Sequence, residues 1–239
     1  MKVGGVDGCR GGWIIVYCDN NSLHGEMLKD IEDLLKFQCN KEIERIAIDI
    51  PMGLPTKEKK YRHVDKKAKE ALKERSSSVF FAPIADLVKY KEEYDYQKDY
   101  EEICKESKNL TGKKISRQIF CIFNKLKDVE KHLKQMQQNS IIEFHPELCW
   151  KNIKSSKKKA SGYKERVKEI SFELNITEDY IDNFIKDIRN NRCSLIAKDD
   201  VVDALCGLIV AKKYPNHLEK IDEADKDSSS TIYYWSKKI

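Results

Sequence analysis

Residues 2–18 read KVGGVDGCRGGWIIVYC, a pattern that predicts a strand, a tight turn and a second strand. Val3, Val6 and the apolar run 13–17 supply the strand-forming side chains. Five of the ten glycines of the chain lie between residues 4 and 12, so we expect unusual backbone angles or close backbone approach there. Asp7 ends the first strand, and burying its charge costs free energy unless a partner such as a metal ion compensates it.

A second carboxylate follows another apolar run. Ile46, Ala47 and Ile48 are typical of a strand buried on both faces, Asp49 comes directly after them, and Pro51 prevents the strand from continuing. In open α/β sheets, functional sites lie at the carboxyl ends of the strands. Asp49 is therefore expected at the edge of the sheet where a site would form.

A third group of acids lies in the most apolar predicted helix, residues 193–214. Asp199 and Asp200 near its start are ordinary partners for a helix dipole. Asp203 lies a full turn further in, beside the core stripe, so the dipole explains it less well. Like charges at these spacings repel each other, and a divalent cation would reverse this repulsion.

Together, Asp7, Asp49 and Asp203 predict a site in which carboxylates from two strands and a later helix hold one or two Mg²⁺ or Mn²⁺ ions. Carboxylate oxygens are the hard ligands that these metals prefer. Such metals activate a water molecule and stabilise the leaving oxygen of a phosphodiester. We therefore expect a metal-dependent nuclease or phosphodiesterase that acts on RNA or DNA.

The composition sets outer limits on the protein. The chain has 239 residues, 40% of them hydrophobic and 36% charged, which suits one globular domain with an insertion. Its formal net charge is +5, a mild excess that permits a local basic groove but excludes the strong basicity of a dedicated nucleic-acid coat. The wealth of lysine and isoleucine favours a bacterial source.

The cysteines and the hydropathy bear on location. Eight cysteines show no CxxC spacing, which argues against a zinc knuckle or a redox motif and favours free thiols in a reducing cytoplasm. The N-terminus enters a strand directly, without a signal peptide. No apolar run approaches the roughly 20 residues that span a bilayer. We expect a cytoplasmic protein without a membrane partner.

Hydrophobic periodicity predicts the remaining elements. A short strand is expected near residues 24–25, and Lys154–Lys159 is expected to form a solvated basic loop. We expect a single domain over 1–239, with a helical insertion at about 84–140. The predicted helices cover 27–37, 61–75, 84–108, 115–138, 162–174, 177–189 and 193–214, and the later strands cover 45–49, 140–145 and 228–235.

Six short motifs in order resemble one protein family. They are Val6-Asp-Gly-Cys-Arg-Gly-Gly-Trp13, Asp49-Ile-Pro-Met-Gly-Leu-Pro55, Arg75-Ser-Ser-Ser-Val-Phe80, Ser116-Arg-Gln118, Glu143-Phe-His-Pro-Glu147 and Asp199-Asp-Val-Val-Asp-Ala204. The chain resembles the domain-of-unknown-function family 429, predicted to consist of RNase H-like nucleases. The resemblance runs over about residues 3–211 and implies an α/β fold with a mixed five-stranded sheet of order 3-2-1-4-5, flanked by helices.

The resemblance also assigns roles. It implies Asp7 as the acid of the first strand, Asp49 as the acid of the fourth, and Asp200 and Asp203 as acids of a helix similar to that of Holliday-junction resolvases. Glu147 belongs to the family's own motif, and a long segment separates it from the helix. The predicted catalytic residues are Asp7, Asp49, Asp203 and Glu147, and the predicted metal ligands are Asp7, Asp49, Asp200 and Asp203.

Other residues are candidates for substrate binding, each with a structural alternative. Arg10 would meet a phosphate or pair with an acid. Arg75, Ser116 and Gln118 would contact a substrate or cap helices. His145 would shuttle a proton or pack structurally. The tyrosines between 90 and 100 would stack on bases, although a helix-packing role is the simpler one.

Two rival functions remain open. The glycine-rich hairpin resembles a phosphate-cradling loop, which would fit a nucleotide- or sugar-phosphate-binding protein of the actin/hexokinase-like branch. A second glycine-rich phosphate loop is missing from the sequence, which counts against this rival. A non-catalytic binding module is the other.

Overall fold

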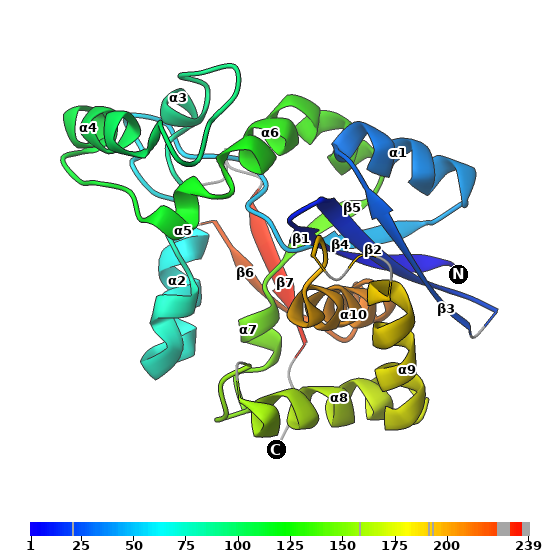
Figure 1. Cartoon of the computed structure of the whole chain (residues 1–239). Coiled ribbons are helices and arrows are strands. Elements are labelled where there is room, and N and C mark those ends of the chain that lie inside the picture. Colours follow the sequence, from blue (N-terminus) through cyan, green and yellow to red (C-terminus); the bar gives the residue numbers. More distant parts are fainter. Residues whose placement is uncertain (21, 158, 191, 193, 224–229, 236–239) are drawn as a thin grey trace. The chain divides into compact units, whose positions relative to one another are not determined.

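The computed structural model describes residues 1–20, 22–157, 159–190, 192, 194–223 and 230–235 (Figure 1). The chain divides into two compact units. The first contains Met1–Ile50, Lys134–Lys220 and Ile232–Ile239, and the second contains Pro51–Leu133 and Ile221–Thr231. The second unit includes most of the segment for which a helical insertion is predicted.

The described residues form one sheet of seven strands in the order β3-β2-β1-β4-β5-β7-β6. The strands are β1 (Val3–Cys9), β2 (Gly12–Asp19), β3 (Ser22–Leu28), β4 (Arg45–Ile48), β5 (Ile141–Phe144), β6 (Glu219–Asp222) and β7 (Thr231–Tyr234). β1 pairs antiparallel with β2 and parallel with β4, and β5 is parallel to β4, so the predicted mixed α/β class is confirmed. The first five strands have the order 3-2-1-4-5, and β7 and β6 continue the sheet beyond β5.

The N-terminal hairpin forms where it is predicted, with Ile14, Ile15 and Val16 of β2 fully buried. β3 is longer than expected, because it pairs with β2 along its whole length from Ser22 to Leu28. The helix predicted from residue 27 therefore begins later. It is α1 (Ile31–Asn40), and the Asp30 side chain accepts a hydrogen bond from the Asp33 N–H at its start (2.9 Å).

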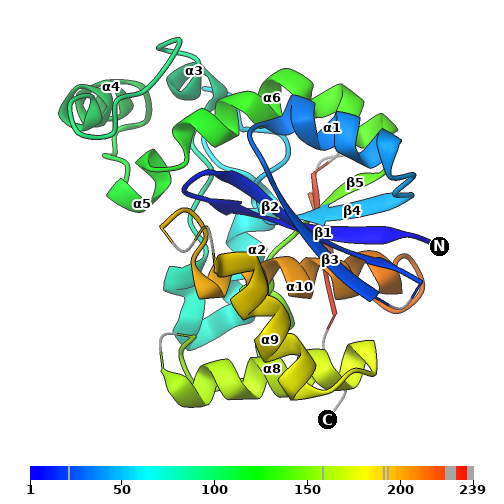
Figure 2. The same ribbon diagram turned by 45° about the vertical axis from the view of Figure 1, so that its right-hand side comes forward.

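Helix α10 (Lys198–Lys213) packs closely against β1. A Cβ atom on Gly5 would lie 2.0 Å from the Ala204 carbonyl oxygen, and one on Gly207 would lie 2.8 Å from the Phe144 ring. Residues 201–211 of α10 are all buried, as expected for a helix that is apolar on every side. Figures 1 and 2 show α10 and α1 on opposite faces of the sheet.

The remaining helices of the first unit are α7 (Pro146–Cys149), α8 (Ala160–Leu174) and α9 (Glu178–Arg189), and the last two pack against α10. They match the predicted helices at 162–174 and 177–189. The helix predicted at 193–214 starts too early, because the Asp200 carboxylate accepts a hydrogen bond from the Ala197 N–H (2.8 Å) and so fixes the beginning of α10. Residue 193 lies outside the described residues.

The second unit is mostly helical. Its elements are α2 (His63–Leu72), the 3₁₀ helix η1 (Lys73–Ser78), α3 (Ala85–Val88), α4 (Tyr100–Thr111), α5 (Arg117–Phe120) and α6 (Phe123–Gln138), the last of which ends in the first unit. The helix predicted at 61–75 is thus α2 followed by a 3₁₀ turn. A buried ion pair between Arg62 and Asp65 (2.6 Å) fixes this region, and Asp65 also accepts the Ala82 N–H (2.8 Å).

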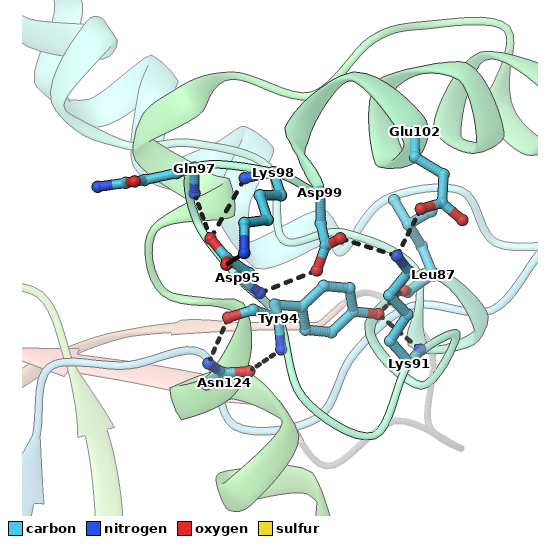
Figure 3. Close-up of polar contacts among 9 residues, drawn as sticks. All are labelled: Leu87, Lys91, Tyr94, Asp95, Gln97, Lys98, Asp99, Glu102 and Asn124. Carbon is cyan, nitrogen blue, oxygen red and sulfur yellow. Dashed lines mark hydrogen bonds and ion pairs between the residues drawn. The ribbon is translucent and has the colours of Figure 1, made fainter.

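The prediction of one long helix at 84–108 is wrong, because residues 89–99 form turns and bends that separate α3 from α4. Figure 3 shows the contacts that fold this segment back. The hydroxyl of Tyr94, whose residue is 3% exposed, donates to the Leu87 carbonyl (2.7 Å), and the Asn124 amide donates to the Tyr94 carbonyl (3.1 Å). The Asp99 carboxylate accepts a hydrogen bond from the Lys91 ammonium (2.8 Å). These contacts, of which the one to Asn124 joins residues 30 apart in the sequence, outweigh the local helical pattern.

The helix predicted at 115–138 is interrupted at residues 121 and 122, between α5 and α6. Ile119, Phe120, Phe123 and Leu126 are buried on both sides of the interruption. The apolar spacing therefore continues through the turn, which is why periodicity alone does not detect it.

Candidate functional site

Two carboxylates lie near the carboxyl ends of neighbouring parallel strands. β1 and β4 pair in parallel up to Val6 and Ile48, and the Asp49 N–H donates a hydrogen bond to the Val6 carbonyl (3.0 Å). Asp7 follows Val6 within β1, which continues to Cys9 and so does not end at Asp7 as predicted, and Asp49 directly follows the last residue of β4. The register therefore places them side by side at one edge of the sheet.

Helix α10 brings a third carboxylate to this edge. Asp203, which is 3% exposed, directly precedes Ala204, whose carbonyl packs against Gly5 of β1. The close contact that Gly5 permits thus positions Asp203 near the end of β1. Glu143, which is 5% exposed, adds a fourth acid, because its register partner on β4 is Ile48. These acids all belong to the first unit.

The electrostatics show that these acids act on one another. Burial raises the pKa of Asp7 well above its usual value, and the charges of Asp49 and Asp203 raise it further. Burial likewise raises the pKa of Asp49 well above its usual value, with added contributions from Asp203 and Glu143. The pKa of Asp203 is also raised, chiefly by burial. Such a group of interacting, desolvated acids is typical of a functional site.

Lys157 supplies a positive charge to this cluster. Its ammonium lies 2.7 Å from Oδ2 of Asp203 and 3.7 Å from the Asp199 carboxylate. Burial lowers the pKa of Lys157, but the charge and the hydrogen bond of Asp203 outweigh this effect and raise it above its usual value. The prediction that residues 154–159 form a solvated loop is therefore wrong for Lys157. No spacing in the sequence signals this contact, since it depends on how the loop meets α10.

The donor atoms of the cluster fit a hard divalent cation, because all of them are carboxylate oxygens. Oδ1 of Asp203 is buried and has no hydrogen-bond partner among the described residues. A cation would satisfy this oxygen and offset the repulsion among the acids. No group of three His, Cys, Asp or Glu side chains in the described part of the chain is already arranged to hold a metal. A cation would have to draw the carboxylates together and compete with Lys157 for Asp203.

The two acids at the start of α10 differ from Asp203. Asp200 accepts the Ala197 N–H, as in a helix cap, and burial raises its pKa to about 6. Its charge also contributes to the raised pKa of Asp7, so it lies within the electrostatic reach of the cluster. The side chain of Asp199 is 50% exposed and faces Lys157.

Glu147 is paired with a buried arginine. Arg166, whose side chain is 1% exposed, lies 3.1 Å from the Glu147 carboxylate and donates to the Gly162 carbonyl (3.1 Å). The charge of Glu147 still adds to the raised pKa of Asp49 and of Asp203. His145 caps α7, since its Nδ1 accepts the Glu147 N–H (3.2 Å). No motif or spacing in the sequence indicates Arg166, which lies inside the regular helix α8.

The other predicted substrate contacts fall in two places. Arg10 is exposed at the turn between β1 and β2 in the first unit. Arg75, Ser116 and Gln118 belong to the second unit. Ser116 caps α5 by accepting the Ile119 N–H (3.3 Å), the structural alternative predicted for it, while Ser116 and Gln118 also line a cavity of that unit.

Gly11 and Gly12 of the hairpin are accounted for by packing. A Cβ atom on Gly12, which has a φ of +137°, would lie 2.2 Å from the Leu28 carbonyl, and one on Gly11 would lie 2.7 Å from the Met27 sulfur. These glycines permit close contact between strands and need no phosphate to explain them. The phosphate-binding rival therefore gains no support from this loop.

The comparisons with known proteins agree with the motifs. A family model described as a protein of unknown function (DUF429) matches residues 5–224, and the chain belongs to this family. Neither a curated protein nor a solved structure matches the chain. Within the described residues, every helix is too short or too polar to cross a membrane.

Proposed function

We propose that this protein is a metal-dependent phosphodiesterase that cleaves nucleic acid, of the RNase H-like type. The observation that carries the proposal is the buried carboxylate of Asp203, which has one unpartnered oxygen and interacts electrostatically with Asp7 and Asp49. The order of the first five strands and the position of two acids at adjacent strand ends support the RNase H-like comparison.

Asp7, Asp49 and Asp203 would hold Mg²⁺ or Mn²⁺, with Asp200 as a further ligand. A bound metal of this kind activates water and stabilises the leaving oxygen of a phosphodiester. The residues themselves supply negative charge that is available only when the protons are removed. Their raised pKa values therefore mean that protons and metal compete for the same oxygens.

Without a bound metal, Lys157 is the counter-charge of the acids. Its ammonium neutralises Asp203 and keeps the buried acids compatible with folding. When released from Asp203, the same ammonium can donate hydrogen bonds to a phosphate, the anion that lysine commonly binds. Glu147 would assist only if it leaves Arg166, so its first role in the proposal is to position α7 and α8.

Cleavage of single- and double-stranded DNA, RNA and RNA–DNA hybrids in Mn²⁺ or Mg²⁺ tests the proposal. Asp7→Asn and Asp203→Asn should each lose at least ~100-fold in rate, which corresponds to about 2.7 kcal/mol of transition-state stabilisation. The control is Asp187→Asn, which changes an exposed acid of α9 in the same unit.

A second measurement does not depend on finding the substrate. Mn²⁺ should raise the melting temperature of the unmodified protein and of Asp187→Asn, but not that of Asp203→Asn. Equal cleavage by Asp7→Asn and the unmodified protein would refute the assignment, and so would cleavage that persists in EDTA.

A further inference from the structure

Two of the motifs that the carboxylate site does not use meet at one cavity of the second unit. The cavity has a volume of about 670 Å³ and is lined by Ser77, Val79 and Phe80 of one motif region and by Ser116 and Gln118 of the other. All of its lining residues lie within Pro51–Leu133. Its size is that of a small-molecule or cofactor site, roughly 300–1,000 Å³.

The wall of the cavity presents aromatic rings to solvent. Tyr61 and Phe81 are 51% and 41% exposed, and their ring centroids are 5.8 Å apart. Lys69 lies over the Phe81 ring, 5.3 Å from its centroid, and donates to the carbonyl groups of Ser76 and Val79. These bonds fix the segment that carries Phe81. Exposed rings on a fixed backbone are suited to stacking against a flat ligand.

The charge of the lining has one sign. Five of the lining residues are lysines and none is acidic. Lys60 and Lys66 lie on one segment and Lys113 and Lys114 on another, and all four are exposed without a hydrogen bond or ion pair from their ammonium groups to a described residue. This arrangement offers several free cations around an aromatic floor. It fits a ligand with a flat ring and more than one negative charge.

Polar side chains add hydrogen-bonding capacity. The exposed Gln118 amide can both donate and accept, which is what the edge of a nucleobase requires. The Ser116 oxygen accepts the Ile119 N–H, so its own hydroxyl proton is available to a ligand. Groups suited to stacking, to recognition of a base edge and to phosphate contacts therefore line this cavity together.

We propose that the cavity binds one unpaired nucleotide of a nucleic-acid single strand, with the base against Tyr61 and Phe81 and the flanking phosphates at the lysines. Lysines on two separate segments favour a strand over a free mononucleotide, because a strand continues with phosphates on both sides of the bound base. The inference goes beyond hydrolysis, since binding at this cavity does not need the carboxylate cluster.

Fluorescence anisotropy of a labelled oligothymidylate and a labelled oligouridylate tests the proposal in EDTA, where metal-dependent cleavage is absent. Phe81→Ala and Gln118→Ala should each weaken binding, Phe81→Ala by about 10-fold, since stacking of one base contributes roughly 1–3 kcal/mol. The control is Tyr90→Ala, which removes another exposed ring of the same unit (49% exposed) that does not line the cavity.

The lysines have a separate readout. The double variant Lys113→Ala/Lys114→Ala should reduce the slope of log affinity against log salt by about 1.4, because each phosphate contact on a single strand contributes roughly 0.7. Lys105→Ala/Lys108→Ala, which changes exposed lysines of α4 outside the cavity, should leave the slope unchanged.

Asp7→Asn should lose cleavage but retain strand binding in EDTA, which separates this proposal from the proposed hydrolysis. Unchanged affinity in both Phe81→Ala and Gln118→Ala would overturn the proposal, as would absence of binding by the unmodified protein in EDTA. Displacement of the strand by a mononucleotide at equal concentration would overturn the preference for a strand.

Discussion

The Lys157 ammonium lies 2.7 Å from Oδ2 of Asp203, while Oδ1 of the same carboxylate is buried and has no hydrogen-bond partner among the described residues. Asp203 therefore binds the counter-charge of the cluster, Lys157, through one oxygen, and its other oxygen is available to a metal ion. The same ammonium is 3.7 Å from Asp199. Any cation that binds between the acids has to compete with Lys157, which makes this lysine the most direct probe of the site.

Replacing Lys157 by methionine should show separately how the Lys157–Asp203 pair stabilises the fold and how it competes with a metal ion. Without metal, Lys157→Met should lose about 1–2 kcal/mol of unfolding free energy, less than the ~3–5 kcal/mol of a fully buried pair, because solvent screens the lysine. Its side chain is 36% exposed. With Mn²⁺, the variant should be stabilised more than the unmodified protein, since the competing cation is gone. Denaturant unfolding with and without Mn²⁺ measures both effects.

The matched control for this prediction is Lys154→Met, which changes an exposed lysine of the same loop. It should change neither the stability nor the metal response. A smaller stabilisation of Lys157→Met by Mn²⁺ than of the unmodified protein would contradict the competition and would indicate that the lysine supports the metal.

The pH dependence of stability provides a second prediction, through Asp200. Its pKa is raised by burial from 3.8 to about 6 in the folded protein. Between these two values the folded chain holds more protons than the unfolded chain, so the contribution of Asp200 to stability falls as pH rises and is constant above about pH 6. Asp200→Asn retains an oxygen for the Ala197 N–H but removes the charge.

In EDTA, the stability of Asp200→Asn relative to the unmodified protein should therefore increase by about 1–3 kcal/mol between roughly pH 4 and pH 6 and then level off. Urea unfolding at a series of pH values measures this difference. A difference that stays constant across the series would show that Asp200 titrates alike in both states. Mn²⁺ should oppose the trend, because bound carboxylates must be deprotonated.

The places of Asp7 in β1 and of Asp49 after β4 could be predicted from sequence because the signal there is local, although β1 runs two residues past Asp7 to Cys9. Each apolar run stops at an aspartate, and parallel pairing needs no further information to place Asp7 beside Asp49. Asp203 could be predicted as well, since an acid beside the core stripe of an apolar helix is unusual. That it lies near the end of β1 rests on Gly5, a contact between elements far apart in the sequence.

The parts that could not be predicted depend on long-range contacts. Lys157 belongs to a run of lysines that has the composition of a solvated loop, and only the folded chain brings it to Asp203. Tyr94 lies in a segment with helical spacing, yet its backbone N–H and carbonyl both bond the side-chain amide of Asn124, 30 residues further on, and this pair stabilises a turn. In both cases a distant partner outweighs the local pattern.

Gly5 is the subject of the third prediction. Gly5→Ala should lose about 3 kcal/mol or more of stability, because the new Cβ would meet backbone atoms of α10 that cannot move independently. Those atoms are the Ala204 oxygen at 2.0 Å and the Leu208 nitrogen at 2.1 Å. Where the variant still folds, Asp203 should shift relative to Asp7, and stabilisation by Mn²⁺ should fall.

Gly4→Ala is the matched control, since Gly4 is the preceding residue of β1. The new Cβ would lie 3.2 Å from Cδ1 of Ile15, the end of a side chain that can adjust. Its stability should stay within ~1 kcal/mol of the unmodified protein. Equal losses in the two variants would show that close packing of α10 on β1 is not what makes Gly5 necessary.

The last prediction concerns Glu147, for which the sequence predicts a catalytic role. Glu147→Gln removes the charge that faces Arg166, whose side chain is 1% exposed and whose Nε has no hydrogen-bond partner among the described residues. We expect Glu147→Gln to lose about 2–4 kcal/mol of unfolding free energy, because a buried guanidinium is left without a counter-charge. Glu173→Gln is the control: Glu173 is similarly buried, at 12% exposure, but its partner Lys213 is 29% exposed and can turn toward water.

The response to metal distinguishes the two roles of Glu147. If Glu147 acts mainly by anchoring Arg166, the stabilisation of Glu147→Gln by Mn²⁺ should match that of the unmodified protein despite the lower starting stability. A full loss of the Mn²⁺ response, with stability unchanged, would instead make Glu147 a metal ligand and Arg166 a secondary partner.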